Sequence, residues 1–284
     1  MNKPLGGKME RGKLSPKSLL KQLSYKKHQK NKKTIEIRNV KICKDDFDIE
    51  NLDFENTLPP KSKKPSSSPL IRKEIGFENL KKLLDSTSSC QISDALAKIT
   101  RRNGVLEGIK SINGKKAYGR VVTVKTSSDD WGTSLLGIDK AKKGEILFIE
   151  TTGKSSAIWG ELTSSCSYEK ELSGTVIWGS TRDIDYLVKS DYPVFAKETV
   201  PNAGNALGLG KINITLKIGE DEKHTIRPGD FVFGDESGVV HVPQELFTEV
   251  MLKTLEIKMN ELNIISEIKK GIPLSKIVGL DNKD

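Results

Sequence analysis

The sequence predicts an α/β domain that follows a long polar N-terminal segment. Helical and strand-like patterns alternate between residues 77 and 196 of the 284-residue chain, and consecutive strand patterns follow from 211 to 242. This order excludes an all-α or all-β fold, and it is more typical of an α/β sandwich than of a long parallel βαβ series. A Pro- and Ser-rich linker at 59–69 separates the two parts. We therefore expect a tail and linker at 1–70 and a folded domain at 71–284.

The basic character of the chain is confined to its N-terminus. Residues 1–44 carry 14 Lys and Arg against 2 Asp and Glu, while the net charge of the whole chain is +9. The tail has too few apolar residues to offset the entropy of ordering, so we expect residues 1–70 to be mostly disordered. The alternating stretch 34–42 could add one edge strand. A Lys-rich arm can bind RNA without sequence preference, and a purely solubilising role is an equally weighted alternative.

Apolar periodicity predicts the elements of the domain in order. Apolar residues at helical spacing predict helices at 77–84, 93–99, 159–171, 185–189 and 244–268. Alternating or continuous apolar runs near glycines and prolines predict strands at 116–124, 143–150, 174–178, 192–196, 211–218, 231–233 and 239–242. Ser93 is the expected cap of the second helix, because a serine oxygen can accept a hydrogen bond from the first turn.

Composition excludes several classes of protein. Three cysteines (Cys43, Cys90 and Cys166) without CxxC spacing argue against a disulfide framework or a cysteine-ligated zinc site. No apolar run approaches the ~18 residues of a membrane span, and no apolar segment of a secretory signal follows the basic N-terminus. We therefore expect a cytoplasmic protein with no membrane partner. His224 and His241 are interpreted as solvent-facing or packing residues.

Polar residues that could carry chemistry follow the predicted strand at 174–178. This strand leads into Arg182 and Asp183, which places two charges at a carboxyl-terminal strand edge, where ligands bind in open α/β sheets. Such a pair is also compatible with a helix cap or a surface ion pair. Upstream, Gly160 would let the backbone approach a ligand, and Glu161 precedes Arg182 with 20 intervening residues. The combination of these residues predicts an active site.

Several motifs resemble the RraA-like family in consistent order over residues 77–245. They are 93–96 (SDAL), 157–162 (AIWGEL), 174–183 (GTVIWGSTRD), 192–196 (YPVFA), 228–232 (PGDFV) and 235–243 (DESGVVHVP). That family includes regulator of ribonuclease activity A and the class II 4-hydroxy-4-methyl-2-oxoglutarate aldolases, which also decarboxylate oxaloacetate. The resemblance implies a swivelling β/β/α-type sandwich, and homotrimeric rings or hexamers of stacked rings, with sites between subunits.

The resemblance also implies a role for each candidate residue. Asp183 would ligate a divalent metal, usually Mg²⁺ or Mn²⁺, and Arg182 would hold a small 2-oxo acid. Glu161 would orient metal-bound water, although the characterised aldolases tend to have the shorter aspartate at this place. The backbone amides of Gly160, Glu161 and Leu162 would receive the substrate carboxylate.

These residue types suit a carbon–carbon lyase. Retro-aldol cleavage and oxaloacetate decarboxylation both leave a pyruvate enolate, whose charge a hard divalent ion and a guanidinium can stabilise. One protein carboxylate with several waters is normal for Mg²⁺. We therefore expect a metal-dependent lyase acting on oxaloacetate or a 4-hydroxy-4-methyl-2-oxoglutarate-like acid. The alternative is a non-catalytic ring that regulates ribonuclease activity, with residues 1–44 contacting RNA or an acidic partner.

Overall fold

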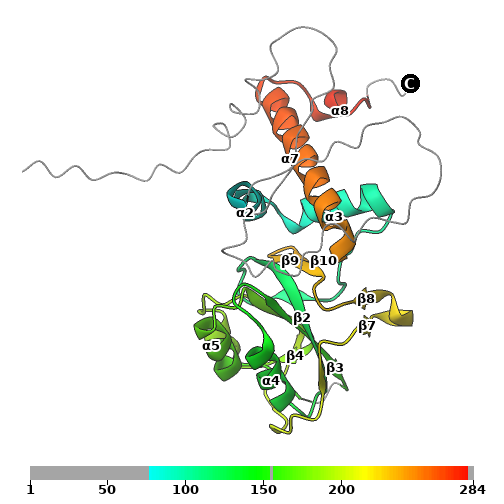
Figure 1. The fold of residues 1–284 in the computed structure, drawn as a ribbon. Helices are drawn as coiled ribbons and strands as arrows, with labels where there is room; N and C mark the ends of the chain where they lie inside the picture. Colours follow the sequence, from blue (N-terminus) through cyan, green and yellow to red (C-terminus); the bar gives the residue numbers. More distant parts are fainter. Residues whose placement is uncertain (1–76, 154–155, 281–284) are drawn as a thin grey trace, which may run out of the picture. The chain divides into compact units, whose positions relative to one another are not determined.

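The computed structural model of the chain describes residues 77–153 and 156–280 (Figure 1). The expected disorder of residues 1–70 and the expected strand at 34–42 lie outside the described residues, as does Cys43. The boundary near residue 71 therefore stays a prediction. Among the described residues, Cys90 and Cys166 are free thiols.

A mixed β-sheet lies at the centre of the described residues. It has eight strands in the order β1-β5-β4-β3-β2-β9-β10, with β6 paired to β2. Four neighbouring strands run parallel: β2 (Ala117–Ser127), β3 (Ile146–Thr152), β4 (Gly174–Thr181) and β5 (Val194–Thr199). Antiparallel partners complete the sheet: β1 (Lys110–Ser111), β6 (Lys211–Ile212), β9 (Phe231–Asp235) and β10 (Gly238–Val242).

One short segment nearly closes this sheet into a barrel. Val105 forms an antiparallel bridge to Val240 of β10, and the N–H of Leu106 donates to the carbonyl of Val239 at 2.9 Å. A few residues later, Lys110 of β1 pairs with Ala196 of β5, at the other edge of the sheet. The chain from Val105 to β1 thus connects both edges, which leaves few unpaired backbone groups there.

Helices cover the sheet in two groups. The first group, beside the parallel strands, comprises α4 (Gly132–Lys140), α5 (Glu161–Glu169) and α6 (Ile184–Leu187). The second group comprises α2 (Phe77–Ser86), α3 (Ser89–Thr100), α7 (Phe247–Lys269) and α8 (Leu274–Ile277), of which α3 packs on α7, β9 and β10. A two-stranded hairpin, β7 (Leu216–Ile218) with β8 (His224–Ile226), forms a second, separate sheet. Two short 3-10 turns complete the described elements: Glu220–Glu222 and Gln244–Leu246.

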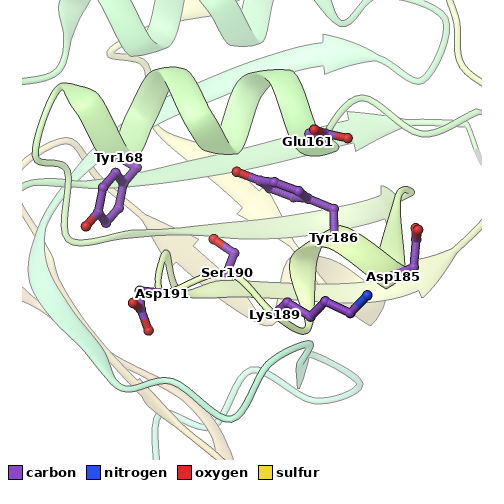
Figure 2. A pocket seen from close by; sticks show the side chains of 7 residues that line it. All are labelled: Glu161, Tyr168, Asp185, Tyr186, Lys189, Ser190 and Asp191. Atoms are coloured by element: carbon purple, nitrogen blue, oxygen red, sulfur yellow. The ribbon is translucent and has the colours of Figure 1, made fainter.

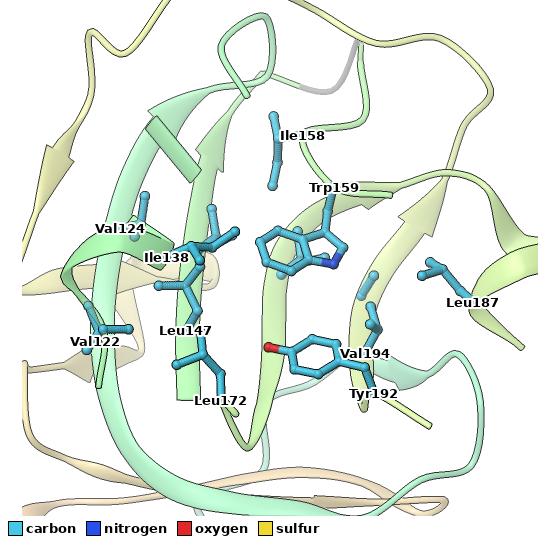
Figure 3. Close-up of a cluster of buried hydrophobic side chains, with 14 residues drawn as sticks. Val122, Val124, Ile138, Leu147, Ile158, Trp159, Leu172, Leu187, Tyr192 and Val194 are labelled. Carbon is cyan, nitrogen blue, oxygen red and sulfur yellow. The ribbon is translucent and has the colours of Figure 1, made fainter. Parts of the chain in front are cut away.

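Three apolar clusters hold these layers together. The cluster between the parallel strands and α4 includes Val124, Ile138, Trp159 and Tyr192 (Figure 3). A second cluster packs the opposite face of the strands against β7 and β8, and a third packs α3 and α7 on β9 and β10. The parallel strands are therefore buried on both faces, which explains their continuous apolar runs. The predicted α/β class is confirmed.

The second helix begins earlier than predicted. Its cap is Ser88 and not Ser93, because the Ser88 hydroxyl accepts from the N–H of Gln91 at 3.3 Å while the Gln91 side chain accepts from the N–H of Ser88 at 3.2 Å. This reciprocal capping box satisfies two N–H groups that the first turn leaves unpaired. Ser93 lies inside the helix.

Further elements differ from the prediction, and β1, β8 and α8 were not predicted. The expected single strand at 211–218 is broken at Asn213, whose φ of 55° is left-handed, so that β6 pairs with β2 while β7 pairs with β8. Helix α4 was not predicted, since glycine is a weak helix former. Gly137 lies in α4 where an added Cβ would meet the side chains of Val124 and Leu147, so glycine lets the helix approach the sheet. No helix in the described ranges combines the length and apolarity needed to cross a bilayer.

Candidate active site

The end of β4 is held by the segment that precedes α5. The N–H of Arg182 donates to the carbonyl of Trp159 at 3.0 Å, and the N–H of Ile158 donates to the carbonyl of Ser180 at 3.3 Å. Trp159 is only 2% exposed, and its indole N–H donates to the Ser164 hydroxyl at 2.7 Å. A buried anchor thus brings the predicted 157–162 and 174–183 motifs together, although some 20 residues separate them in sequence.

Asp183 occupies a sharp turn between β4 and α6. Its backbone is left-handed, with φ 57° and ψ 44°, a conformation that aspartate tolerates better than most residues. Its Oδ2 accepts a hydrogen bond of 3.0 Å from the N–H of Glu161, the first residue of α5. The Arg182 Nε lies 3.5 Å from the same oxygen. The carboxylate therefore lies between a guanidinium and a helix N-terminus, both of which favour negative charge.

Gly160 provides the space for this arrangement. A Cβ added at Gly160 would meet Oδ2 of Asp183 and would come 3.1 Å from Cγ of Arg182. The backbone of Gly160 is extended, with φ −173°, so space and not an unusual torsion calls for glycine here. The space beside Gly160 is thus taken by Asp183. The expected approach of a ligand to the Gly160 backbone stays a prediction.

Two of the three backbone amides expected to receive a substrate carboxylate already have partners. The N–H of Gly160 donates to the Thr163 hydroxyl at 2.9 Å, and that of Glu161 donates to Asp183. The N–H of Leu162 lies in the first turn of α5, where no acceptor within the helix is available. The role of these amides toward a substrate stays a prediction.

The donor set around Asp183 fits a hard divalent cation. Among the described residues, Oδ1 of Asp183 and the exposed carboxylate of Glu161 have no hydrogen-bonding partner. No group of three or more His, Cys, Asp or Glu side chains suited to a metal occurs in the part of the chain that the structure describes. The site thus offers one or two carboxylates, which suits Mg²⁺ or Mn²⁺ with several waters. It does not suit a structural zinc ion, which takes four protein ligands.

A cavity of about 460 Å³ opens beside Glu161, between α5 and α6 (Figure 2). Its lining is polar and aromatic: Glu161, Tyr168, Asp185, Tyr186, Lys189, Ser190 and Asp191. Glu161 belongs to both the cavity and the Arg182–Asp183 site. Apart from Glu161, the sequence did not single out these residues. The available signal was a tyrosine in each of two short helices.

A buried carboxylate that the sequence did not single out lies beside α4. Asp130 is 2% exposed, and its oxygens accept from the Thr133 hydroxyl at 2.6 Å and from three N–H groups of the 207–209 loop at 2.8–3.0 Å. Burial alone would raise the pKa of Asp130, but these hydrogen bonds lower it well below its usual range. Because both of its oxygens accept hydrogen bonds from protein groups, Asp130 anchors the 207–209 loop. The glycine-rich stretch at 204–210, which needs acceptors for its amides, was the available signal.

His241 forms a second buried polar pair. Its Nε2 lies 2.8 Å from Oδ2 of Asp230, and the two side chains are 7% and 3% exposed. Burial would raise the pKa of Asp230, but His241 and the amides of Arg227 and Gln244 lower it. His241 is thus a packing residue, one of the two alternatives expected for it, and its polar partner explains its burial.

The chain is similar in sequence or in structure to several known proteins. The protein MJ0644 of Methanocaldococcus jannaschii is 36% identical over 181 residues, covering 62% of this chain and 85% of that protein. A putative 4-hydroxy-4-methyl-2-oxoglutarate aldolase of Pseudomonas aeruginosa is 29% identical over 140 residues, covering 48% of this chain and 83% of that protein. A crystal structure of a Pseudomonas syringae protein aligns with a TM-score of 0.61 at 26% identity, covering 70% of this chain and 96% of that one.

The sequence profile of one family matches most of the described domain. The RraA-like profile, described as Aldolase/RraA, matches residues 89–241, which is more than half of the chain. The match runs from α3 into β10 and includes Gly160, Glu161, Arg182 and Asp183. It confirms the resemblance carried by the sequence motifs. The chain belongs to the RraA-like family.

Proposed function

We propose that the protein is a divalent-metal-dependent lyase that cleaves or decarboxylates a small 2-oxo acid at Arg182 and Asp183. The observation that carries the proposal is the Asp183 carboxylate, held through Oδ2 by the N–H of Glu161 while Oδ1 has no partner among the described residues. The name of the Pseudomonas aeruginosa relative, a putative aldolase, supports the same class of reaction.

Asp183 would hold Mg²⁺ or Mn²⁺, with Glu161 beside it. The bound ion supplies positive charge that stabilises an enolate. Arg182, whose side chain is 39% exposed, can donate to the carboxylate or keto oxygen of a 2-oxo acid. The N–H of Leu162 is a further donor at the start of α5. These groups would orient the acid and favour the negative charge that develops as a carbon–carbon bond breaks.

Glu161 is the proton-accepting candidate. Its side chain is exposed and has no partner in the described residues, so its carboxylate is available to a substrate hydroxyl or to a water. In a retro-aldol cleavage a base takes the proton of the 4-hydroxyl, the C3–C4 bond breaks, and the pyruvate enolate is protonated at C3. In the decarboxylation of oxaloacetate, the departing carboxylate leaves the same enolate and no base is needed. The site therefore suits both reactions.

Pyruvate release tests this proposal directly. Oxaloacetate and 4-hydroxy-4-methyl-2-oxoglutarate would each be incubated with the protein and Mg²⁺, Mn²⁺ or a chelator. We expect release that requires the metal and is lost in Asp183→Ala, while Asp94→Asn, an exposed carboxylate on α3, stays active. A protein that is inert on both acids, with Mn²⁺ binding unchanged in Asp183→Ala, contradicts the proposal.

A second candidate function, regulation of RNA decay, is favoured by the charge of residues 1–44. Such a segment would bind the phosphates of RNA, and its affinity for RNA would fall steeply as the salt concentration rises. RNA binding by the full chain and by a variant lacking residues 1–70, across a salt series, tests this role. Equal binding by both forms would remove the tail from the proposal. Light scattering of the same samples tests the proposed trimer or hexamer.

A further inference from the structure

The cavity between α5 and α6 indicates what the substrate carries beyond its reacting group. We propose that this cavity binds a neutral, hydroxylated chain, so that the aldol substrate is a 4-hydroxy-2-oxo acid with a polyhydroxylated tail and not a dicarboxylic acid. This inference rests on the proposed lyase function of Arg182 and Asp183. Decarboxylation of oxaloacetate, which has no tail, reports on the reacting group alone.

The cavity shares Glu161 with the Arg182–Asp183 site. Glu161 lines the cavity, and its N–H is 3.0 Å from Oδ2 of Asp183. Asp185, two residues after Asp183 and in the first turn of α6, lines the cavity as well. A molecule held by its 2-oxo acid at Arg182 therefore has the cavity as adjoining space. Its volume of about 460 Å³ lies in the range typical of small-molecule sites.

The charges of the lining do not favour a second substrate carboxylate. Glu161 and Asp185 have no ion-pair partner within the described residues, whereas Asp191 is paired with Lys115 at 2.7 Å. The lining contains one lysine, Lys189, which likewise has no described partner. With Glu161 beside the proposed metal, Asp185 still balances Lys189, so the lining offers an anionic tail no net attraction. Hydroxyl groups can instead donate to both carboxylates and accept from the lysine.

The remaining lining groups suit a chain of hydroxylated carbons. The Tyr186 hydroxyl lies 2.8 Å from the Ser165 hydroxyl, which fixes one ring as a wall of the cavity. Tyr168 is 54% exposed, and its hydroxyl has no partner among the residues described. In Figure 2 the charged groups of Glu161, Asp185 and Lys189 lie toward one end of the cavity, and Tyr168 lies toward the other. A tail would enter past the charged groups and pack its C–H faces on the tyrosine rings.

The reaction of such a substrate balances without another reactant. The C4 hydroxyl loses its proton, its oxygen forms the carbonyl of a hydroxyaldehyde, and the C3–C4 bonding pair becomes the pyruvate enolate. Protonation at C3 then gives pyruvate. The products are pyruvate and a hydroxyaldehyde that retains the tail.

Binding of uncleavable probes tests the inference apart from catalysis. The probes are 2-hydroxy acids, which form no enolate: 3-deoxygluconate with a hydroxylated tail, 2-hydroxyglutarate with a second carboxylate, and lactate with no tail. Calorimetry of the full chain with Mg²⁺ should show 3-deoxygluconate binding about tenfold or more tighter than lactate, the value of one hydrogen bond to a charged group. We expect 2-hydroxyglutarate to bind no tighter than lactate. Equal affinities, no binding by any probe, or tightest binding of 2-hydroxyglutarate overturns the inference.

A charge-neutral variant sharpens this test. Asp185→Asn should weaken 3-deoxygluconate binding about fivefold to tenfold and strengthen 2-hydroxyglutarate binding, because a repelling charge is removed. The matched control, Asp94→Asn on α3, should change neither affinity. Opposite shifts for the two probes cannot come from a general loss of structure. Unchanged affinities in Asp185→Asn overturn the assignment of the cavity.

The two proposals fail in different ways. A protein that binds 3-deoxygluconate through Asp185 but releases no pyruvate from 2-keto-3-deoxygluconate keeps the cavity assignment and overturns the lyase function. A protein that cleaves 4-hydroxy-4-methyl-2-oxoglutarate faster than 2-keto-3-deoxygluconate keeps the lyase function and overturns the assigned substrate class.

Discussion

Asp130 and Asp183 are two aspartates in similar places with opposite surroundings. Asp130 lies just beyond β2 and Asp183 just beyond β4, two parallel strands of one sheet. Asp130 accepts from several backbone N–H groups, whereas Asp183 accepts from one. The residue Asp130 is 2% exposed, and both of its oxygens are bonded. The Asp183 side chain is 33% exposed, and its Oδ1 has no partner among the described residues.

The difference in exposure and hydrogen bonding makes Asp130 a residue that stabilises the fold and Asp183 a candidate metal ligand. A buried carboxylate whose acceptor sites are filled by the protein stabilises the fold, because removing it leaves several donors without partners. A carboxylate with a free oxygen near the surface adds little to the fold and keeps capacity for a metal or substrate. The chemical role of these two residues follows from their partners, since the side chains are identical.

The largest expected effect is on activity at Asp183. Asp183→Asn removes the charge while keeping the shape, so pyruvate release should fall by at least about a hundredfold, the typical value of one preorganised electrostatic group. Its free energy of unfolding should change by less than about 1 kcal/mol, because the side chain is partly exposed and partly unpaired. Coupled assays and urea unfolding measure the two quantities. A large loss of stability with retained activity would reverse the assignment of the two aspartates.

Asp130 should show a large effect on stability. Asp130→Asn places an amide among the N–H groups of Leu207, Gly208 and Leu209, so at least one donor faces another donor. We expect unfolding to become easier by about 3 kcal/mol, as for a broken buried charged network. Urea unfolding measures the loss, and Asp139→Asn, exposed at the end of α4, should cost under about 0.5 kcal/mol. Equal values for both variants would contradict an anchoring role.

The stabilisation by Asp130 should depend on pH with a defined sign. Its folded-state pKa is lowered, so its contribution is fully present above the unfolded value of about 3.9 and is lost as pH falls through the lower folded value. The difference in free energy of unfolding between wild type and Asp130→Asn should therefore be constant near neutral pH and should shrink below about pH 4. Urea unfolding across pH 3 to 7 measures it. A difference that grows on acidification would show that the carboxylate is not the stabilising form.

The sequence predicted most helices and strands of the domain, because these depend on local patterns, and it singled out Arg182 and Asp183 as a candidate site. Periodicity reports which residues are buried, and a motif such as 174–183 carries its own identity. Asp130 was not singled out because the loop amides that bond to it lie 77–79 residues away in sequence. The break at Asn213 escaped because alternation alone does not reveal which strand each half pairs with. The partners of Asp130 and the pairing of β6 and β7 depend on contacts between distant segments, which local sequence patterns do not report.

The smallest expected effect tests whether Asp183 must occupy its observed position. The Cβ of Gly160→Ala would meet Oδ2 of Asp183, so the carboxylate must move away from the N–H of Glu161. A displacement of this kind should lower pyruvate release about tenfold, since catalytic groups lose rate when shifted by about 1 Å. The free energy of unfolding should fall by no more than about 1 kcal/mol, the value of one exposed hydrogen bond.

A double-mutant cycle separates this steric effect from a general effect of the added methyl group. In Asp183→Ala no carboxylate remains for the new Cβ to meet, so Gly160→Ala should cost less stability in that background than in the wild type. Equal costs in both backgrounds would mean that the methyl group acts on Arg182 or on the backbone instead. Full activity in Gly160→Ala would mean that the catalytic position of Asp183 differs from the one that the N–H of Glu161 now holds.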